Sequence, residues 1–373
     1  MVPPYGVDAC RLEHNMEMDG AVIRKAFIAM ATLLMAQATC GPLAAQPRSE
    51  SGIAGVSVFG RPPAGFNPLT ASNTELDEYG FPPRPDRNLG EEARKRWEQR
   101  VMSQTRIVPE LAQTNVFHGL VKGIKPVKTG SGTIDATSSN WSGYAITDPT
   151  NPFVKPGSQV EAQFVVPKPA SGCADGSTET YSSANWVGID GALSNDVFQA
   201  GTETDLDCRS GPSYYAWIEW FPNSEIKVTN LAIAPGDLIS LSAFVASDGS
   251  KHLSIENLTT RKSVALAMKP PPGTELVGNS VEWIVERPTL NNVALSKLTN
   301  YLLNPWNNIS AVTFPKLGEP PVAYLPDSAP ATATTYHLWM SDGSNEISGV
   351  QLFSIPATAK TAPSLWFVAT TPY

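Results

Sequence analysis

The amino-acid sequence predicts a body built almost entirely of β-strands, and three observations support this fold class. The 373 residues include 33 prolines and 28 glycines, which favours many short strands joined by turns. From residue 140 onward, short runs rich in Val, Ile, Phe, Tyr and Trp are separated by Pro, Gly, Asn and Ser. Only residues 88–104 have a convincing helical pattern. We therefore expect an antiparallel sandwich or barrel.

The N-terminus has the pattern of an export signal. Arg24 and Lys25 precede an apolar run at residues 26–36, and small residues end at Ala45, where cleavage is expected. The apolar run is too short to span a bilayer as a helix. We therefore expect a signal region over residues 1–45 and a secreted protein, extracellular or periplasmic, with no membrane partner after the signal is removed.

The segment between the signal and the body predicts a propeptide followed by a linker. Residues 46–85 are rich in Pro, Gly, Ser and Asn and lack a sustained apolar period, which predicts a flexible stretch. Asn88 is a fair N-cap for the predicted helix, and two glutamates follow in its first turn, where the helix dipole favours acids. Residues 122–137 are polar and rich in Gly and Ser, which predicts a linker.

Charge is divided unevenly along the chain. Residues 84–128 carry ten Lys and Arg against five Asp and Glu, whereas residues 138–373 carry twelve against twenty-one. A basic leader therefore precedes an acidic body that would attract it. The net charge of −8 argues against a nucleic-acid partner. The expected organisation is a signal region at 1–45, a propeptide and linker at 46–137, and a β-sandwich domain at 138–373.

The four cysteines suggest one disulfide. Cys10 and Cys40 fall in the part expected to be removed. Cys173 and Cys208 remain as a natural pair in an oxidising environment, and two unpaired buried thiols are the alternative.

Two predicted strands can be analysed face by face, because side chains alternate along a strand. The strand at residues 214–220 places Trp217 and Glu219 on one face. The strand at residues 281–286 places Glu282 and Glu286 on the face opposite Trp283. Acids on a face that also carries aromatic rings suggest a peptide-binding groove. An ordinary solvated face remains the alternative, since glutamate is common there.

Carboxylate chemistry is the main chemistry that the body offers. Of four histidines, His14 and His118 lie outside the body, and His252 and His337 are isolated. No HExxH metal motif and no GxSxG nucleophile motif occurs, and no paired Asp-Thr-Gly signature is present. With one disulfide, no free cysteine remains as a nucleophile. We expect no metal and no cofactor.

Six motifs follow one another after residue 138. They are NWSGY at 140–144, SANWVGIDG at 183–191, FQAG at 198–201, WIEWFP at 217–222, ENLTT at 256–260 and NSVEWIVE at 279–286. Each motif alone is weak. In this order and rough spacing, the series resembles the glutamic peptidase family, the eqolisins, across residues 138–314.

The resemblance implies a fold and a catalytic pair. The expected fold is a concanavalin-like sandwich of two large, bent antiparallel sheets with a concave face for the substrate. Gln199 occupies the family's catalytic glutamine position and Glu282 its catalytic glutamate position. The residues that match those lining or supporting the family's groove are Trp141, Gly143, Trp186, Asp190 and Glu219. The resemblance also implies a precursor that carries a basic propeptide.

The expected function is a secreted acid endopeptidase, a monomer acting on proteins or peptides. A glutamate has an ordinary pKa of about 4.3, so Glu282 can act as a base in mild acid and return the proton to the leaving amine. The Gln199 amide does not titrate there and can stabilise the oxyanion. A histidine base would be mostly protonated under these conditions.

Two other functions remain open. A concanavalin-like module could bind glycans or peptides without chemistry. A glycoside hydrolase could pair Glu282 with Glu219 or Glu286 as two carboxylates. Gln199 within its QAG motif distinguishes the peptidase, because neither alternative requires it.

Overall fold

A computed structural model describes residues 47–129, 132–170, 173, 176–315, 319–353 and 363–369. The signal region expected at residues 1–45 lies outside these residues. The described residues fall in one compact unit, Ala45–Tyr373. Among them, no helix combines the length and apolar character needed to cross a membrane.

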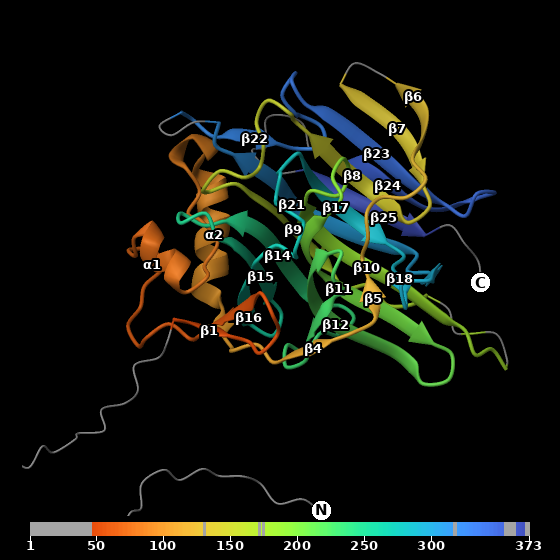
Figure 1. Ribbon diagram of the computed structural model, residues 1–373, viewed down its shortest axis with the longest axis horizontal. Coiled ribbons are helices and arrows are strands. Elements are labelled where there is room, and N and C mark those ends of the chain that lie inside the picture. The colour runs from red at the N-terminus through yellow and green to blue at the C-terminus, as the bar shows by residue number, and fades with distance from the viewer. Residues whose placement is uncertain are drawn as a thin grey trace, which may run out of the picture. The chain divides into compact units, whose positions relative to one another are not determined.

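Two sheets dominate this unit (Figure 1). The first, called the groove sheet, runs in the order β6 (Lys125–Thr129), β7 (Thr133–Ser138), β23 (Thr334–Ser341), β8 (Trp141–Thr147), β17 (Ser280–Glu286), β10 (Thr180–Ile189), β11 (Val197–Asp207), β12 (Gly211–Phe221), β13 (Ile226–Val228) and β4 (Leu111–Gln113). The second, called the back sheet, runs β24 (Glu346–Phe353), β25 (Ser364–Ala369), β21 (Leu303–Thr313), β9 (Gln159–Val165), β14 (Leu238–Val245), β15 (Lys251–Asn257), β16 (Lys262–Met268), β2 (Val56–Phe59) and β1 (Arg48–Glu50).

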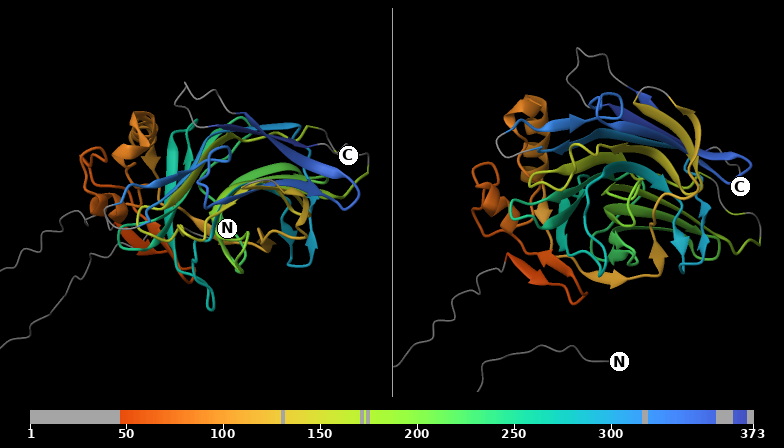
Figure 2. Two further views of the ribbon diagram at one scale, coloured as in Figure 1. Left: turned by 90° about the horizontal axis from the view of Figure 1, so that it is seen from above. Right: turned by 45° about the horizontal axis from the view of Figure 1, so that its top comes forward.

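Short strands complete the pairing. These are β3 (Thr105–Arg106) and β22 (Val322–Tyr324) on the back sheet, β20 (Lys297–Leu298) beside β10, and a small sheet of β5 (Val116–Phe117), β18 (Thr289–Leu290) and β19 (Ala294–Leu295). Most pairs are antiparallel, and the long strands are visibly curved in Figure 2. The expected antiparallel sandwich is confirmed.

The main core lies between the two sheets. Alternate residues of β17, including Trp283, join this core with Val187 and Phe198 from the groove sheet. Phe164 and Leu241 face them from the back sheet. Because one face of the groove sheet is used for this packing, every second residue of its strands points to the opposite face, where the candidate site lies.

The prediction of a flexible stretch at residues 46–85 is wrong. β2 is an apolar run whose four residues are all buried, and it adds an edge strand to β16. A helix, α1 (Asn73–Glu78), follows and was also missed. It begins with a capping box in which Ser72 and Glu75 bond each other's backbone N–H, a signal visible in the sequence.

The predicted long helix is present as α2 (Glu91–Ser103). Its N-cap is Gly90 rather than the predicted Asn88, which lies in a short 3₁₀ turn, η1 (Arg87–Leu89). The Asp86 side chain accepts a hydrogen bond from the Asn88 backbone N–H, so Asp86 is the N-cap of this 3₁₀ turn.

The prediction of a linker at residues 122–137 is also wrong where the structure describes this segment. β6 and β7 form a hairpin, and β7 pairs in parallel with β23. Ile134 and Ala136 pack beside Leu338, so the few apolar residues of this polar segment were sufficient to build a strand.

The predicted disulfide between Cys173 and Cys208 is confirmed, with their Cα atoms 5.6 Å apart. The bridge closes the chain segment that contains all of β10 and β11, two neighbouring strands of the groove sheet.

Candidate active site

Gln199 and Glu282 lie on opposite sides of one glycine in the groove sheet. Gly188 of β10 is the Cα partner of Gln199 on β11 and also of Glu282 on β17. Directly paired residues point to the same face of a sheet, so both side chains stand on the face away from the main core. Two strand spacings place their Cα atoms about 9.5 Å apart. That distance lets the two side chains converge on a small group between them.

Gly188 keeps the space between the pair open. A Cβ at this position would lie 2.9 Å from a ring carbon of Trp186 and 3.2 Å from the Cβ of Gln199. Any side chain there would therefore collide with the wall of the site and occupy the gap. The requirement for glycine is steric and local to the site.

The Gln199 amide is oriented by a neighbouring carboxylate. Glu219 is its Cα partner on β12, and Gln199 Nε2 donates to Glu219 Oε2 at 2.9 Å. Both side chains are fully buried. Within the described part of the chain, Gln199 Oε1 has no hydrogen-bond partner. The amide thus presents a fixed N–H donor and an available carbonyl acceptor.

Glu282 is a buried carboxyl group whose two oxygens lack hydrogen-bond partners among the described residues. Burial raises its pKa well above the ordinary value, because the charged form loses its hydration. Asp190 adds to this upward shift through its own negative charge. A titratable group in this condition is a strong candidate for proton transfer.

Other predicted residues surround the pair on the same face. Trp186 Nε1 donates to Glu286 Oε2 at 2.9 Å, and the Trp186 ring meets the Trp141 ring edge-on at 4.9 Å. Gly143 has a φ of 138°, and a Cβ there would lie 2.1 Å from the Trp283 carbonyl oxygen. These residues form the aromatic wall of the site and fix its backbone.

Asp190 acts on the loop that precedes Glu282. Its carboxylate accepts hydrogen bonds from the backbone N–H groups of Val277, Gly278 and Asn279 at 2.7–2.9 Å. Burial raises its pKa to about 6 despite these bonds. Asp190 therefore positions the start of β17, and its oxygens are already engaged.

The chain N-terminal to the body crosses this face. The His118 carbonyl accepts from Gln199 Nε2 at 2.5 Å, and the His118 backbone N–H donates to Glu219 at 3.0 Å. Further along, Asn140 bonds the Leu120 carbonyl and the Lys122 N–H through its side-chain amide. In this part of the chain, β4 pairs with β13 and β5 pairs with β18 (Figure 1). We call residues 114–124 the cover segment.

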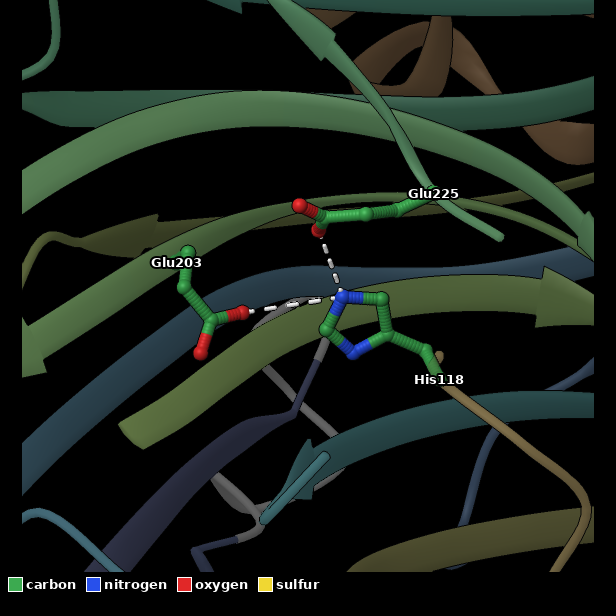
Figure 3. Close-up of side chains that lie close together, drawn as sticks. All are labelled: His118, Glu203 and Glu225. Atoms are coloured by element: carbon green, nitrogen blue, oxygen red, sulfur yellow. Dashed lines mark hydrogen bonds and ion pairs between the residues drawn. The ribbon is translucent and has the colours of Figure 1, made fainter. Parts of the chain in front are cut away.

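The His118 side chain enters an acidic pocket beside Gln199 (Figure 3). Its Nε2 lies 2.8 Å from Glu225 Oε2 and 3.6 Å from Glu203 Oε2. The imidazole ring stacks on Trp217 with centroids 3.7 Å apart. Burial lowers the pKa of His118, and burial together with the charge of Asp205 raises that of Glu203 well above its usual range. Three possible metal-ligand atoms, one from each of His118, Glu203 and Glu225, lie within 4.8 Å of one another.

Sequence analysis missed these pocket residues. It placed His118 outside the body and did not consider Glu203 or Glu225. Strand alternation could have found Glu203, which is four residues after Gln199 on the same strand and so points to the same face. Glu225 lies between β12 and β13, where no periodicity identifies a face.

The two glutamates that a glycosidase could pair with Glu282 start far from it along the sheet, and their carboxyl groups are engaged by Gln199 and Trp186. Glu219 is three strands from Glu282 in the same cross-strand row, about 14 Å between Cα atoms. Glu286 is four residues along β17, about 13 Å away. Glycosidases of the two-carboxylate type hold these groups about 5–9.5 Å apart.

Comparisons with known proteins identify relatives of this arrangement. Residues 139–322 match the peptidase A4 family. Aspergillopepsin-2 of Aspergillus niger is 30% identical over 176 residues, which are 43% of this chain and 60% of that protein. Scytalidopepsin B of Scytalidium lignicola is 33% identical over 102 residues, which are 27% of this chain and 38% of that protein. The chain thus matches less than two thirds of either relative.

Among solved structures, scytalido-glutamic peptidase with a transition state analog inhibitor is 21% identical. The alignment covers 62% of this chain and 98% of that one, with a TM-score of 0.46.

Proposed function

We propose that this chain, whose residues 139–322 match the peptidase A4 family, is an endopeptidase that cuts in acid with Gln199 and Glu282. The observation that carries this proposal is the placement of both side chains on one face, opposite the same glycine.

Each partner has one role in the proposed reaction. Ionised Glu282 takes a proton from water as the water oxygen attacks the carbonyl carbon. Gln199 Nε2 donates to the oxygen that becomes negatively charged. Glu282 then returns its proton to the amide nitrogen, and the C–N bond breaks. Glu219 holds the Gln199 amide in place for this role.

The contact between Gln199 and the cover segment supports this assignment. In the covered chain, Gln199 Nε2 already bonds a peptide carbonyl oxygen, that of His118. A substrate carbonyl in the same place would meet the same donor. Glu282 is buried in the uncut chain, which raises its pKa and favours the neutral acid. Removal of the cover segment admits water to the Glu282 carboxyl group and favours its ionised form, which is the base.

We further propose that residues 46–137 act as a propeptide of an exported precursor and that the mature enzyme is a monomer. The cover segment lies where a peptide substrate would lie, so the uncut chain excludes substrates. The expected site of removal lies between Lys122 and Asn140.

A single comparison of substrates tests the proposed function against its alternatives. The purified full chain is incubated between about pH 3 and about pH 7 with a denatured protein and, separately, with a polysaccharide. Peptide fragments from the protein, with no sugar released, are the expected result. Sugar release, or binding of either polymer without products, would show that the chain is not a peptidase.

A further inference from the structure

The pocket around the His118 side chain is built by the body, while its occupant belongs to the cover segment. Glu203 lies on β11, and Trp217 and Tyr215 lie on β12. The Tyr215 hydroxyl donates to Glu225 Oε1 at 3.0 Å and leaves Oε2 free to face the imidazole. All four side chains are buried. The pocket is therefore oriented by contacts that do not involve His118.

The occupant fits through two kinds of contact. Its flat ring stacks on Trp217 with planes inclined by 8°, and its Nε2 lies at hydrogen-bond distance from Glu225. Glu203 Oε2 lies 3.6 Å from the same imidazole nitrogen, so the pocket places a second carboxyl oxygen near a donor. A flat ring that carries an N–H satisfies the pocket, whereas a purely apolar side chain would leave Glu225 Oε2 unpaired.

The backbone hydrogen bonds of His118 fix its position relative to Gln199 and Glu282. The same residue whose side chain fills the pocket gives its carbonyl to Gln199 and its N–H to Glu219. If Gln199 binds the carbonyl of the bond to be cut, the pocket receives the side chain of the residue on the N-terminal side of that bond.

We propose that this pocket, made by Trp217, Glu203 and Glu225, is a substrate subsite that selects histidine immediately before the cut bond. The proposal rests on the proposed function, because it assigns a substrate preference to that site. The cover segment then occupies the groove with the side chain that the groove recognises best.

A metal site built from the same residues is the competing explanation. Ligands held at about 2.0–2.2 Å from a zinc ion in tetrahedral geometry lie roughly 3.2–3.6 Å apart. The 2.8 Å between His118 Nε2 and Glu225 Oε2 is shorter and matches a direct hydrogen bond. The other Glu225 oxygen is engaged by Tyr215. The geometry favours a side-chain pocket, and the test below includes the metal as an outcome.

The first arm of the test needs no catalysis. Hydrogen exchange of residues 114–124 is measured in the full chain for His118→Phe, Glu225→Gln and the double variant. Phenylalanine keeps the stacking and removes the donor. Each single variant should raise exchange about tenfold or more, and the double variant should add little to either. Glu179→Gln, an exposed partner of Lys297, is the matched control and should change nothing. Unaltered exchange in β10 and β11 shows that each variant is folded.

The second arm measures cleavage. Peptides that differ only in His, Phe or Leu before the cut bond are compared by kcat/KM at the least acidic pH that supports cleavage, where the free imidazole is most neutral. We expect histidine to exceed both by about tenfold or more, and Glu225→Gln to bring the ratio to within about threefold. A ratio near one in the wild type, or a preference that survives Glu225→Gln, overturns the subsite while leaving the peptidase intact.

Failure of the proposed function gives a different pattern. If the double variant adds little to the exchange of either single variant but no peptide is cut, the imidazole pocket is supported and the peptidase is rejected. If the effects of the two single variants on exchange simply add, the pocket is rejected. Exchange that rises on adding a chelator, and falls again with zinc, assigns the three residues to a metal and overturns the proposal.

Discussion

Two buried contacts connect the N-terminal residues to the body, and they differ in charge. Arg100 of α2 contacts the back sheet, where it lies 2.8 Å from Glu256 and 2.6 Å from Glu161. His118 contacts the groove sheet beside Gln199. The first contact is between full charges. The second is a hydrogen-bonded imidazole that burial keeps neutral.

The pKa values of the two cations shift in opposite directions. Burial lowers the pKa of Arg100, but the charges of Glu256 and Glu161 outweigh this effect and raise it above its ordinary value. Burial also lowers the pKa of His118, and the bond to Glu225 only partly compensates. Arg100 is therefore a permanent anchor, whereas the hold of His118 on the groove depends on pH.

This difference corrects a simple electrostatic expectation. The sequence suggests that a basic leader is held over the groove by the acidic body. In the structure, the buried ion pairs of α2 lie on the back sheet, away from Gln199 and Glu282. The cover segment is held by hydrogen bonds and by apolar packing of Leu120, Val121 and Ile124. Charge anchors the leader, and substrate-like contacts close the groove.

Removing the anchor should produce the largest loss of stability. Arg100→Ala leaves Glu256, which is 4% exposed, without its cation. Breaking one partner of a buried pair costs about 3–5 kcal/mol of unfolding free energy. Denaturant unfolding of the full chain measures it. Arg94→Ala, which removes an exposed pair with Glu98, is the control and should cost less than about 1 kcal/mol. Equal losses in the two variants would contradict the anchor.

Changing the groove should reduce activity while stability is retained. Gln199→Glu places a third carboxyl group in the row with Glu282 and Glu219 and removes the neutral donor. The carboxyl groups would then share protons, and turnover should fall about a hundredfold to a thousandfold. Peptide cleavage in mild acid measures this effect, and the unfolding midpoint reports stability. Unchanged turnover would remove Gln199 from the mechanism.

The cover contact should produce a smaller effect that depends on pH. The buried imidazole binds protons less readily than a freed one, whose pKa is about 6.5. The cover segment is therefore held most tightly above that pH. As the pH falls below it, the equilibrium constant for closing the cover decreases by up to about tenfold per pH unit. His118→Phe removes this titration, while the other groups that face the pocket are the same in both proteins.

Hydrogen exchange of residues 114–124 between about pH 8 and about pH 4 separates the two proteins. Corrected for intrinsic exchange, the wild type should open more steeply with acid than His118→Phe. Parallel curves would mean that the titration of His118 does not control the cover.

The groove sheet could be predicted from sequence because its strands alternate strictly. Glu282 was expected on the face opposite Trp283, and in the structure Trp283 lies in the main core while Glu282 lies on the other face. The motif order, rather than alternation, brought Gln199 together with Glu282, because no sequence period reports that two strands flank Gly188. The family resemblance supplied the long-range pairing that local patterns lack.

The N-terminal region was harder to predict because its strands are short and pair with strands of the body. β2 and β7 form on sheet edges that the body supplies, so their own composition resembles a loop. His118 is similar: its neighbours Glu203 and Glu225 lie about 85 and 107 residues further along the chain. Contacts of this kind arise only from the folded topology.

The most direct test of the central claim is peptide cleavage by Glu282→Gln. This change keeps the shape of the buried side chain and removes the base, so cleavage should fall by about a hundredfold to ten-thousandfold. The cover segment should remain protected, since Glu282 has no hydrogen bond to it among the described contacts. Hydrogen exchange of β17 confirms that the variant is folded. A folded Glu282→Gln protein that cuts peptides as fast as the wild type in mild acid would contradict the account.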